Sequence, residues 1–81
     1  MNERMLARLG LLEQKKQEAE KLAILIDNLK KDINYALFPD EIEAMEISQA
    51  EVLMHELSEK WRNYIGLKKD IDKLEKELNK K

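Results

Sequence analysis

The stretch Phe38-Pro39-Asp40 decides the fold, because it interrupts a helical pattern that otherwise fills the chain. Pro39 disfavours helical geometry at Phe38 and has no amide hydrogen with which a helix could continue. We therefore predict a first helix over about residues 3–37 and a turn at 38–40.

On both sides of this stretch, apolar residues recur every seven positions, with apolar companions three or four positions away. In the first half these residues are Met5, Leu12, Ala19, Ile26 and Ile33, with companions Leu22, Leu29 and Ala36. In the second half they are Ala50, Leu57, Tyr64, Ile71 and Leu78, with companions Leu53, Leu67 and Leu74. The exceptions at companion positions are Arg8, Lys15 and Lys60. This heptad stripe, here called the seam, predicts two helices that pack along each other.

Two long helices joined by a short connection must run antiparallel. We therefore predict an all-α fold with a single domain over residues 1–81, an antiparallel helical hairpin (coiled coil) whose second helix covers about 40–79. Near the turn we expect Ile33 and Leu37 to lie beside Ile42 and Met45.

The start of the second helix has two candidate signals. Asp40 is followed three residues later by Glu43, and Ser48 is followed three residues later by Glu51. Both fit an N-terminal capping pattern. Because the residues between the two signals are good helix formers, we predict one continuous helix, with a kink at 47–48 as the alternative.

A second apolar stripe runs beside the seam. Ile47, Met54 and Trp61 are also spaced by seven, and residues 22–26 are apolar without exception. Such a broad apolar face is typical of a helix with more than one neighbour. We therefore predict that two hairpins dimerise into a four-helix bundle. The predicted interface consists of Leu22, Leu25, Ile26, Leu29, Ile33, Ile47, Leu53, Met54, Leu57, Trp61 and Tyr64.

The composition limits the function further. The 81 residues include 15 Lys and Arg against 17 Asp and Glu, and 40% of them are charged. Cysteine is absent, which excludes disulfides and thiolate metal sites. Residues 1–8 lack the apolar stretch of a signal peptide, and no run is long enough to span a membrane. We expect a soluble cytoplasmic protein that does not engage a membrane.

One group of residues could be mistaken for a metal site. His55 has Glu51 four residues before it and Glu59 four residues after it, so the three share one helical face. Di-iron helical bundles instead use Glu-Xaa-Xaa-His pairs, and the residue three before His55 is Val52. We interpret the three as an ion-pair face and predict no metal and no cofactor.

The serines give no indication of nucleophilic catalysis. Ser48 and Ser58 are the only serines, threonine is absent, and no glycine elbow surrounds either serine. We predict that the protein is not an enzyme and has no catalytic residues.

Three lysine pairs, which begin at Lys15, Lys30 and Lys68, raise the question of nucleic acid. Each pair is interleaved with carboxylates, such as Asp27 and Asp32 around the second pair. Intrahelical ion pairing then cancels much of the local positive field that phosphate binding needs. We predict that nucleic acid is not the main partner.

One family resemblance follows from the stretch 26–33 and the later pair Ser48-Gln49. Their layout resembles the short helical-hairpin phosphatases that dephosphorylate a sporulation response regulator. In that family the Ser-Gln pair leads into a Leu-Asp whose carboxylate carries the function. Glu51 and Val52 stand at those positions here, so the resemblance extends to the helical layout and not to the phosphatase residue.

These observations favour a non-enzymatic coiled-coil interaction module, scaffold or adaptor that associates with itself and possesses a homodimeric interface. Another protein could occupy the same broad face. The alternatives are a nucleic-acid-binding hairpin dimer and a small helical regulator that docks on a signalling or transcription protein.

Overall fold

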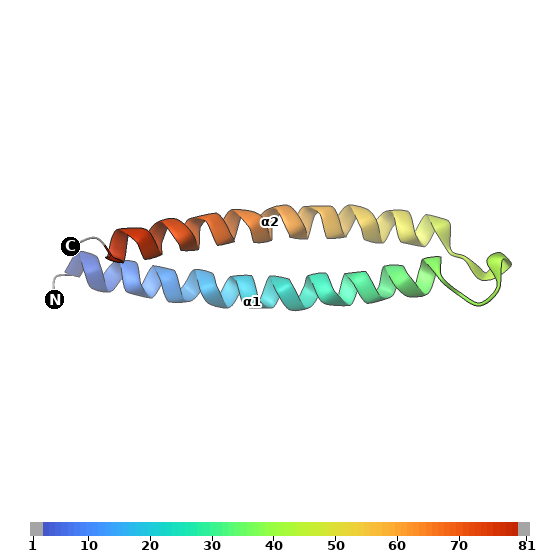
Figure 1. Ribbon diagram of the computed structural model, residues 1–81, viewed down its shortest axis with the longest axis horizontal. Coiled ribbons are helices and arrows are strands. Elements are labelled where there is room, and N and C mark those ends of the chain that lie inside the picture. The colour runs from blue at the N-terminus through green and yellow to red at the C-terminus, as the bar shows by residue number, and fades with distance from the viewer. Residues whose placement is uncertain (1–2, 80–81) are drawn as a thin grey trace.

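The computed structural model describes residues 3–79 and contains two long helices joined by a compact turn. Helix α1 covers Glu3–Leu37, the short 3-10 helix η1 covers Ile42–Ala44, and helix α2 covers Ile47–Asn79. The helices run antiparallel, so both ends of the chain lie at one end of the molecule and the turn lies at the other (Figure 1). The predicted all-α antiparallel hairpin is confirmed.

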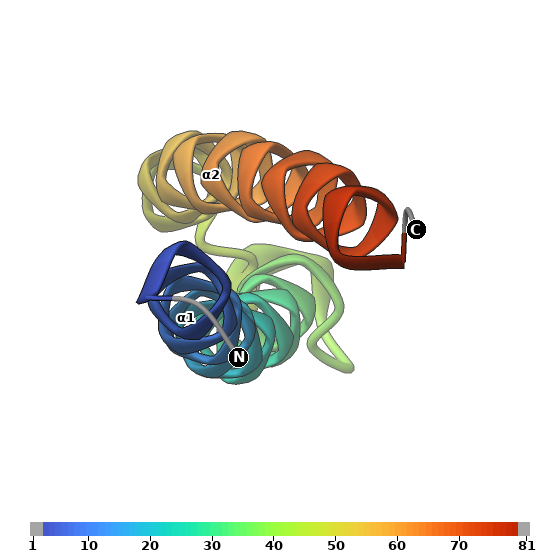
Figure 2. The same ribbon diagram turned by 90° about the vertical axis from the view of Figure 1, so that its left-hand side faces the viewer.

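The molecule is a rod. Its principal extents are 62 × 15 × 14 Å. Seen from the end that carries the chain termini, the two helices lie one above the other and are inclined to each other (Figure 2). Within residues 3–79, neither helix is long and apolar enough to cross a membrane.

The seam forms the contact between the helices. Of the described residues, seven are buried, and all seven occupy seam positions: Leu12, Ala19, Leu29, Ile33, Ala36, Ala50 and Ile71. Tyr64, Leu67, Leu74 and Leu78 pack against the part of this cluster nearest the chain termini. The seven-residue spacing places these side chains on one side of each helix, which is why they meet.

Ion pairs across the helices compensate for two of the charged exceptions in the seam. The Nζ atom of Lys15 lies 3.2 Å from Asp70 Oδ2, and Arg8 Nη1 lies 3.7 Å from Glu77 Oε2. Exposed pairs of this kind stabilise a fold by about 1 kcal/mol or less each. Their main effect is on register, since each one favours a single alignment of α1 against α2.

The turn differs from the prediction in its length. The amide of Phe38 donates to Asn34 O at 2.9 Å and completes α1, and Pro39 then ends the helix as expected. The chain does not enter α2 at residue 40. It forms η1, becomes extended at Met45, and begins α2 only at Ile47. The predicted continuous helix from residue 40 is therefore wrong, and the alternative at 47–48 lies close to the true break.

A long-range hydrogen bond explains this late start. The amide of Glu46 donates to Ala36 O at 2.9 Å, so the extended segment is tied to the last turn of α1. Ala36 and Ala50 are small and buried beside this point, which lets the two helices approach closely. Ile42 is 82% exposed, so it does not cover Leu37 as expected.

The contrast between buried and exposed isoleucines gives a test of the fold. Ile71 is 4% exposed in the seam, whereas Ile24 is 62% exposed on the outer side of α1. We expect Ile71→Ala to lower the free energy of unfolding by about 2–5 kcal/mol, because it leaves a cavity between the helices. The matched variant Ile24→Ala should change it by about 0.5 kcal/mol or less. Chemical denaturation measures both, and equal losses would contradict the seam.

Candidate protein-interaction face

An open apolar groove runs along one side of the hairpin in the half nearest the turn. Met54, Leu57, Ser58 and Trp61 of α2 and Ile26 and Lys30 of α1 line a space of about 500 Å³. These six residues are here called the apolar flank. The α2 residues are three, four and seven positions apart, so they share one helical face.

The large side chains of the apolar flank remain in water. Trp61 is 55% exposed and Met54 is 49% exposed, and Ile47, seven residues before Met54, is 48% exposed. The cause is geometric, because each helix has one neighbour and side chains beside the seam have nothing to cover them. Complete burial of such a side chain is worth about 1.5–3 kcal/mol. The flank is therefore a surface whose exposure is costly.

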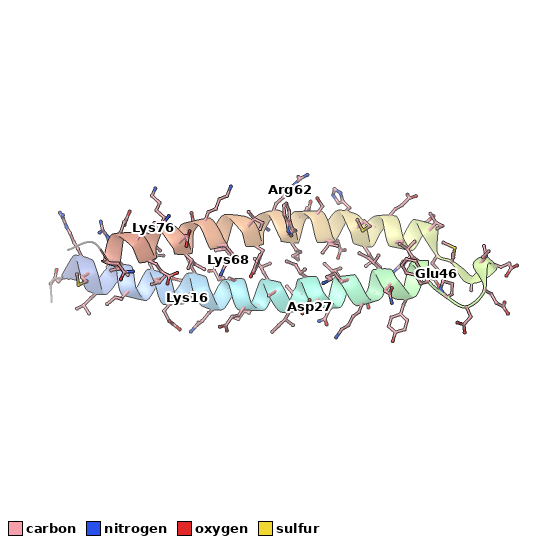
Figure 3. All side chains as sticks on the ribbon, in the orientation of Figure 1. Lys16, Asp27, Glu46, Arg62, Lys68 and Lys76 are labelled. Atoms are coloured by element: carbon pink, nitrogen blue, oxygen red, sulfur yellow. The ribbon has the colours of Figure 1, made fainter. Side chains whose placement is uncertain are left out.

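The same side of the hairpin becomes charged toward the chain termini. There Lys16, Glu20, Lys68 and Glu75 line a second open groove with Ala19, Ala23, Tyr64 and Ile71. Lys68 reaches from α2 toward α1 (Figure 3), and Lys16 Nζ lies 3.9 Å from Glu75 Oε2. One side of the rod thus passes from apolar near the turn to charged near the termini.

The structure divides the predicted interface residues into three groups. Leu29 and Ile33 are buried in the seam, and Leu22, Ile26, Leu53, Leu57 and Tyr64 are half-buried along it. Ile47, Met54 and Trp61 are exposed on the side of the apolar flank. Leu25 is also exposed, but Leu22, three residues earlier, lines a groove on the other side of the seam with Asn63 and Leu67. The structure therefore does not bring Leu25 together with Trp61.

Charge is strongly divided along the rod, a feature that was not predicted from the sequence. Residues 32–59 contain eight carboxylates and no Lys or Arg. The rest of the chain contains all 15 Lys and Arg and nine carboxylates. The eight are Asp32, Asp40, Glu41, Glu43, Glu46, Glu51, Glu56 and Glu59. A count of charge in successive windows, rather than around each lysine pair, would have found this division.

The same division explains where the ion pairs between helices form. Those found among the described residues join Arg8 to Glu77, Lys15 to Asp70 and Lys16 to Glu75, all in the half near the chain termini. Near the turn, residues 32–59 contribute no Lys or Arg, and Lys30, which lies beside them in the apolar flank, is 3.9 Å from Asp27 Oδ1 of its own helix. The carboxylates of residues 32–59 therefore outnumber the cations around them.

The candidate chemical residues lie on the surface. The Nε2 atom of His55 lies 3.4 Å from Glu59 Oε1, and both side chains are exposed. In the described part of the chain, no three His, Asp or Glu side chains are grouped so that they could hold a metal ion. Ser58 lines the apolar flank, and Ser48 is exposed in the first turn of α2.

Comparison with known proteins adds no functional information. The chain matches no protein-family model, no curated protein and no solved structure. The likeness of Ser48-Gln49 to the hairpin phosphatases is thus not accompanied by a match to a family.

Trp61 is the single tryptophan and reports directly on the apolar flank. We expect its emission maximum to shift to shorter wavelength as protein concentration rises, because a partner surface that covers the flank removes the indole from water. A control variant combines Trp61→Phe with Val52→Trp, which moves the indole to an exposed position on the opposite side of α2. Its emission should stay at long wavelength, and identical behaviour of the two proteins would contradict a specific role for the flank.

Proposed function

We propose that this chain is a non-enzymatic protein–protein interaction module, a scaffold or adaptor, that associates with a second copy of itself through the apolar flank. The observation that carries the proposal is the open groove lined by Ile26, Met54, Leu57 and Trp61. In a four-helix bundle, each helix contacts two neighbours, and such a groove receives side chains from the second hairpin.

The exposed surface of the hairpin supports association. The chain exposes 6784 Å². A compact monomer of its mass, 9.6 kDa, exposes about 5,100 Å². The difference is larger than the roughly 800 Å² that each partner buries in a standard interface. A single hairpin therefore has ample surface to bury without loss of its own core.

The thinness of the core supports the same proposal. The least exposed of the described residues, Ala50, is 3% exposed, and no larger side chain among residues 3–79 is completely buried. The radius of gyration is 18.3 Å, against about 12 Å for a compact domain of this length. Packing a second hairpin on the apolar flank would give the molecule a true interior.

Nucleic acid has less support as a partner. Arg62 and Lys76 project from α2 away from α1 (Figure 3), but Asp72 Oδ2 lies 4.0 Å from Lys76 Nζ. Phosphate binding would need cations that are not already paired, and it would leave the apolar flank uncovered. The flank fits a protein surface and not a phosphate backbone.

A pair of charge insertions tests the proposal. We expect sedimentation equilibrium to show a dimer for the native chain and a monomer for Met54→Glu, because the new carboxylate would lose its hydration in the interface. Val52→Glu is the matched control, since it adds the same charge two residues away on the opposite side of α2. It should remain dimeric. A monomeric native chain, or equal loss of the dimer in both variants, would contradict self-association through the flank.

A further inference from the structure

The charge division and the apolar flank together determine how two copies can be arranged. The acidic residues gather around the turn, where Asp40, Glu41, Glu43 and Glu46 are all exposed. Most of the cations lie in the other half of the rod, where Lys68, Lys69, Lys73 and Lys76 are exposed on α2, whereas Lys30 lies in the apolar flank itself. Each hairpin is therefore acidic at one end and basic toward the other, over an extent of 62 Å.

The apolar flank is not centred on the rod. Its α2 residues lie between Met54 and Trp61, and Ile47 continues the exposed apolar stripe to the first residue of α2. Beyond Trp61 the stripe gives way to the charged groove that contains Lys68. A second copy that covers the flank must therefore be placed over the half near the turn.

We propose that two hairpins pack antiparallel on their apolar flanks, with a two-fold axis between Leu57 and Ser58, so that the acidic turn of each lies beside the basic half of the other. This inference rests on the proposed self-association. With the axis at this position, Met54 faces Trp61 of the second copy, and Trp61 faces its Met54. The two largest exposed side chains of the flank thus cover each other twice, as an isologous interface requires.

The same axis brings Ile47 opposite Lys68 of the second copy. The aliphatic stem of a lysine can cover an apolar side chain while its ammonium group stays in water. At the helical rise of 1.5 Å per residue, the paired stretch from Ile47 to Lys68 is about 33 Å long. The turn of each hairpin then extends past Lys68 of the other, over the side of the rod where Lys16 and Lys68 lie with Glu20 and Glu75.

Electrostatics distinguishes this arrangement from a parallel one. A parallel dimer would place two acidic turns side by side, so that the two copies of residues 32–59, with sixteen carboxylates and no Lys or Arg of their own, would lie next to each other. The antiparallel dimer instead places each turn beside the part of the chain in which 15 Lys and Arg outnumber nine carboxylates. Opposite charges within one Debye length, about 10 Å at 0.1 M ionic strength, attract, and like charges repel. The charge pattern therefore favours a second copy in the antiparallel orientation as the occupant of the groove.

Single-cysteine variants test the orientation, because the native chain contains no cysteine. We would prepare Ile47→Cys and Lys68→Cys and treat each variant alone, and then their mixture, with a short bis-maleimide. The antiparallel arrangement predicts covalent dimers in the mixture and none in either variant alone. A mixture of Val52→Cys with Lys68→Cys is the matched control, since Val52 lies on the opposite side of α2, and it should give no covalent dimer.

Sedimentation of the same samples separates the two levels of the proposal. A dimer in which each variant links to itself is parallel and overturns this inference while self-association stands. The proposed axis is also overturned if the protein is dimeric but Ile47→Cys and Lys68→Cys form no covalent dimer with each other. The same holds if the mixture of Val52→Cys with Lys68→Cys gives as much covalent dimer. A monomer in every sample overturns the proposed self-association itself.

Discussion

The contact between α1 and α2 is a single stripe of side chains, because two helices that lie side by side can cover only one face of each other. Leu12, Ala19 and Ile71 form part of this stripe and are buried in it. Residues one step to the side, such as Met54 and Trp61, remain exposed for the same reason. The thin core, the large surface and the open apolar flank all follow from this constraint.

The balance of charge changes along the length of the rod, whereas apolar packing holds the two helices together across its width. Near the chain termini, Lys15 with Asp70 and Arg8 with Glu77 support the alignment of the two helices where the seam carries charged residues. Near the turn the carboxylates have no such partners within their own segment. Ion pairs between the helices therefore form near the chain termini, whereas carboxylates remain in excess near the turn. In the proposed antiparallel dimer, cations from near the termini of one copy would offset the carboxylates near the turn of the other.

Local sequence rules were sufficient for the helices and insufficient for the turn. Pro39 marked the end of α1 correctly, and seven-residue spacing identified each of the buried residues as part of the seam. The start of α2 was missed because the hydrogen bond from Glu46 to Ala36 O joins residues ten positions apart, which no capping pattern around Asp40 can reveal. The stripe of Ile47, Met54 and Trp61 could be predicted from the seven-residue spacing in the sequence. The sequence did not predict on which side of the seam Leu25 lies, and only the structure shows that it is separated from Trp61.

The central claim is that the hairpin completes its core by binding a second copy, so that folding and association are coupled. Thermal unfolding followed by far-ultraviolet circular dichroism, over about a hundredfold range of protein concentration, tests this claim most directly. A coupled dimer gains stability by mass action, and its Tm rises with concentration. A cooperative transition whose Tm is the same at every concentration would contradict the claim and identify the hairpin as a self-sufficient monomer.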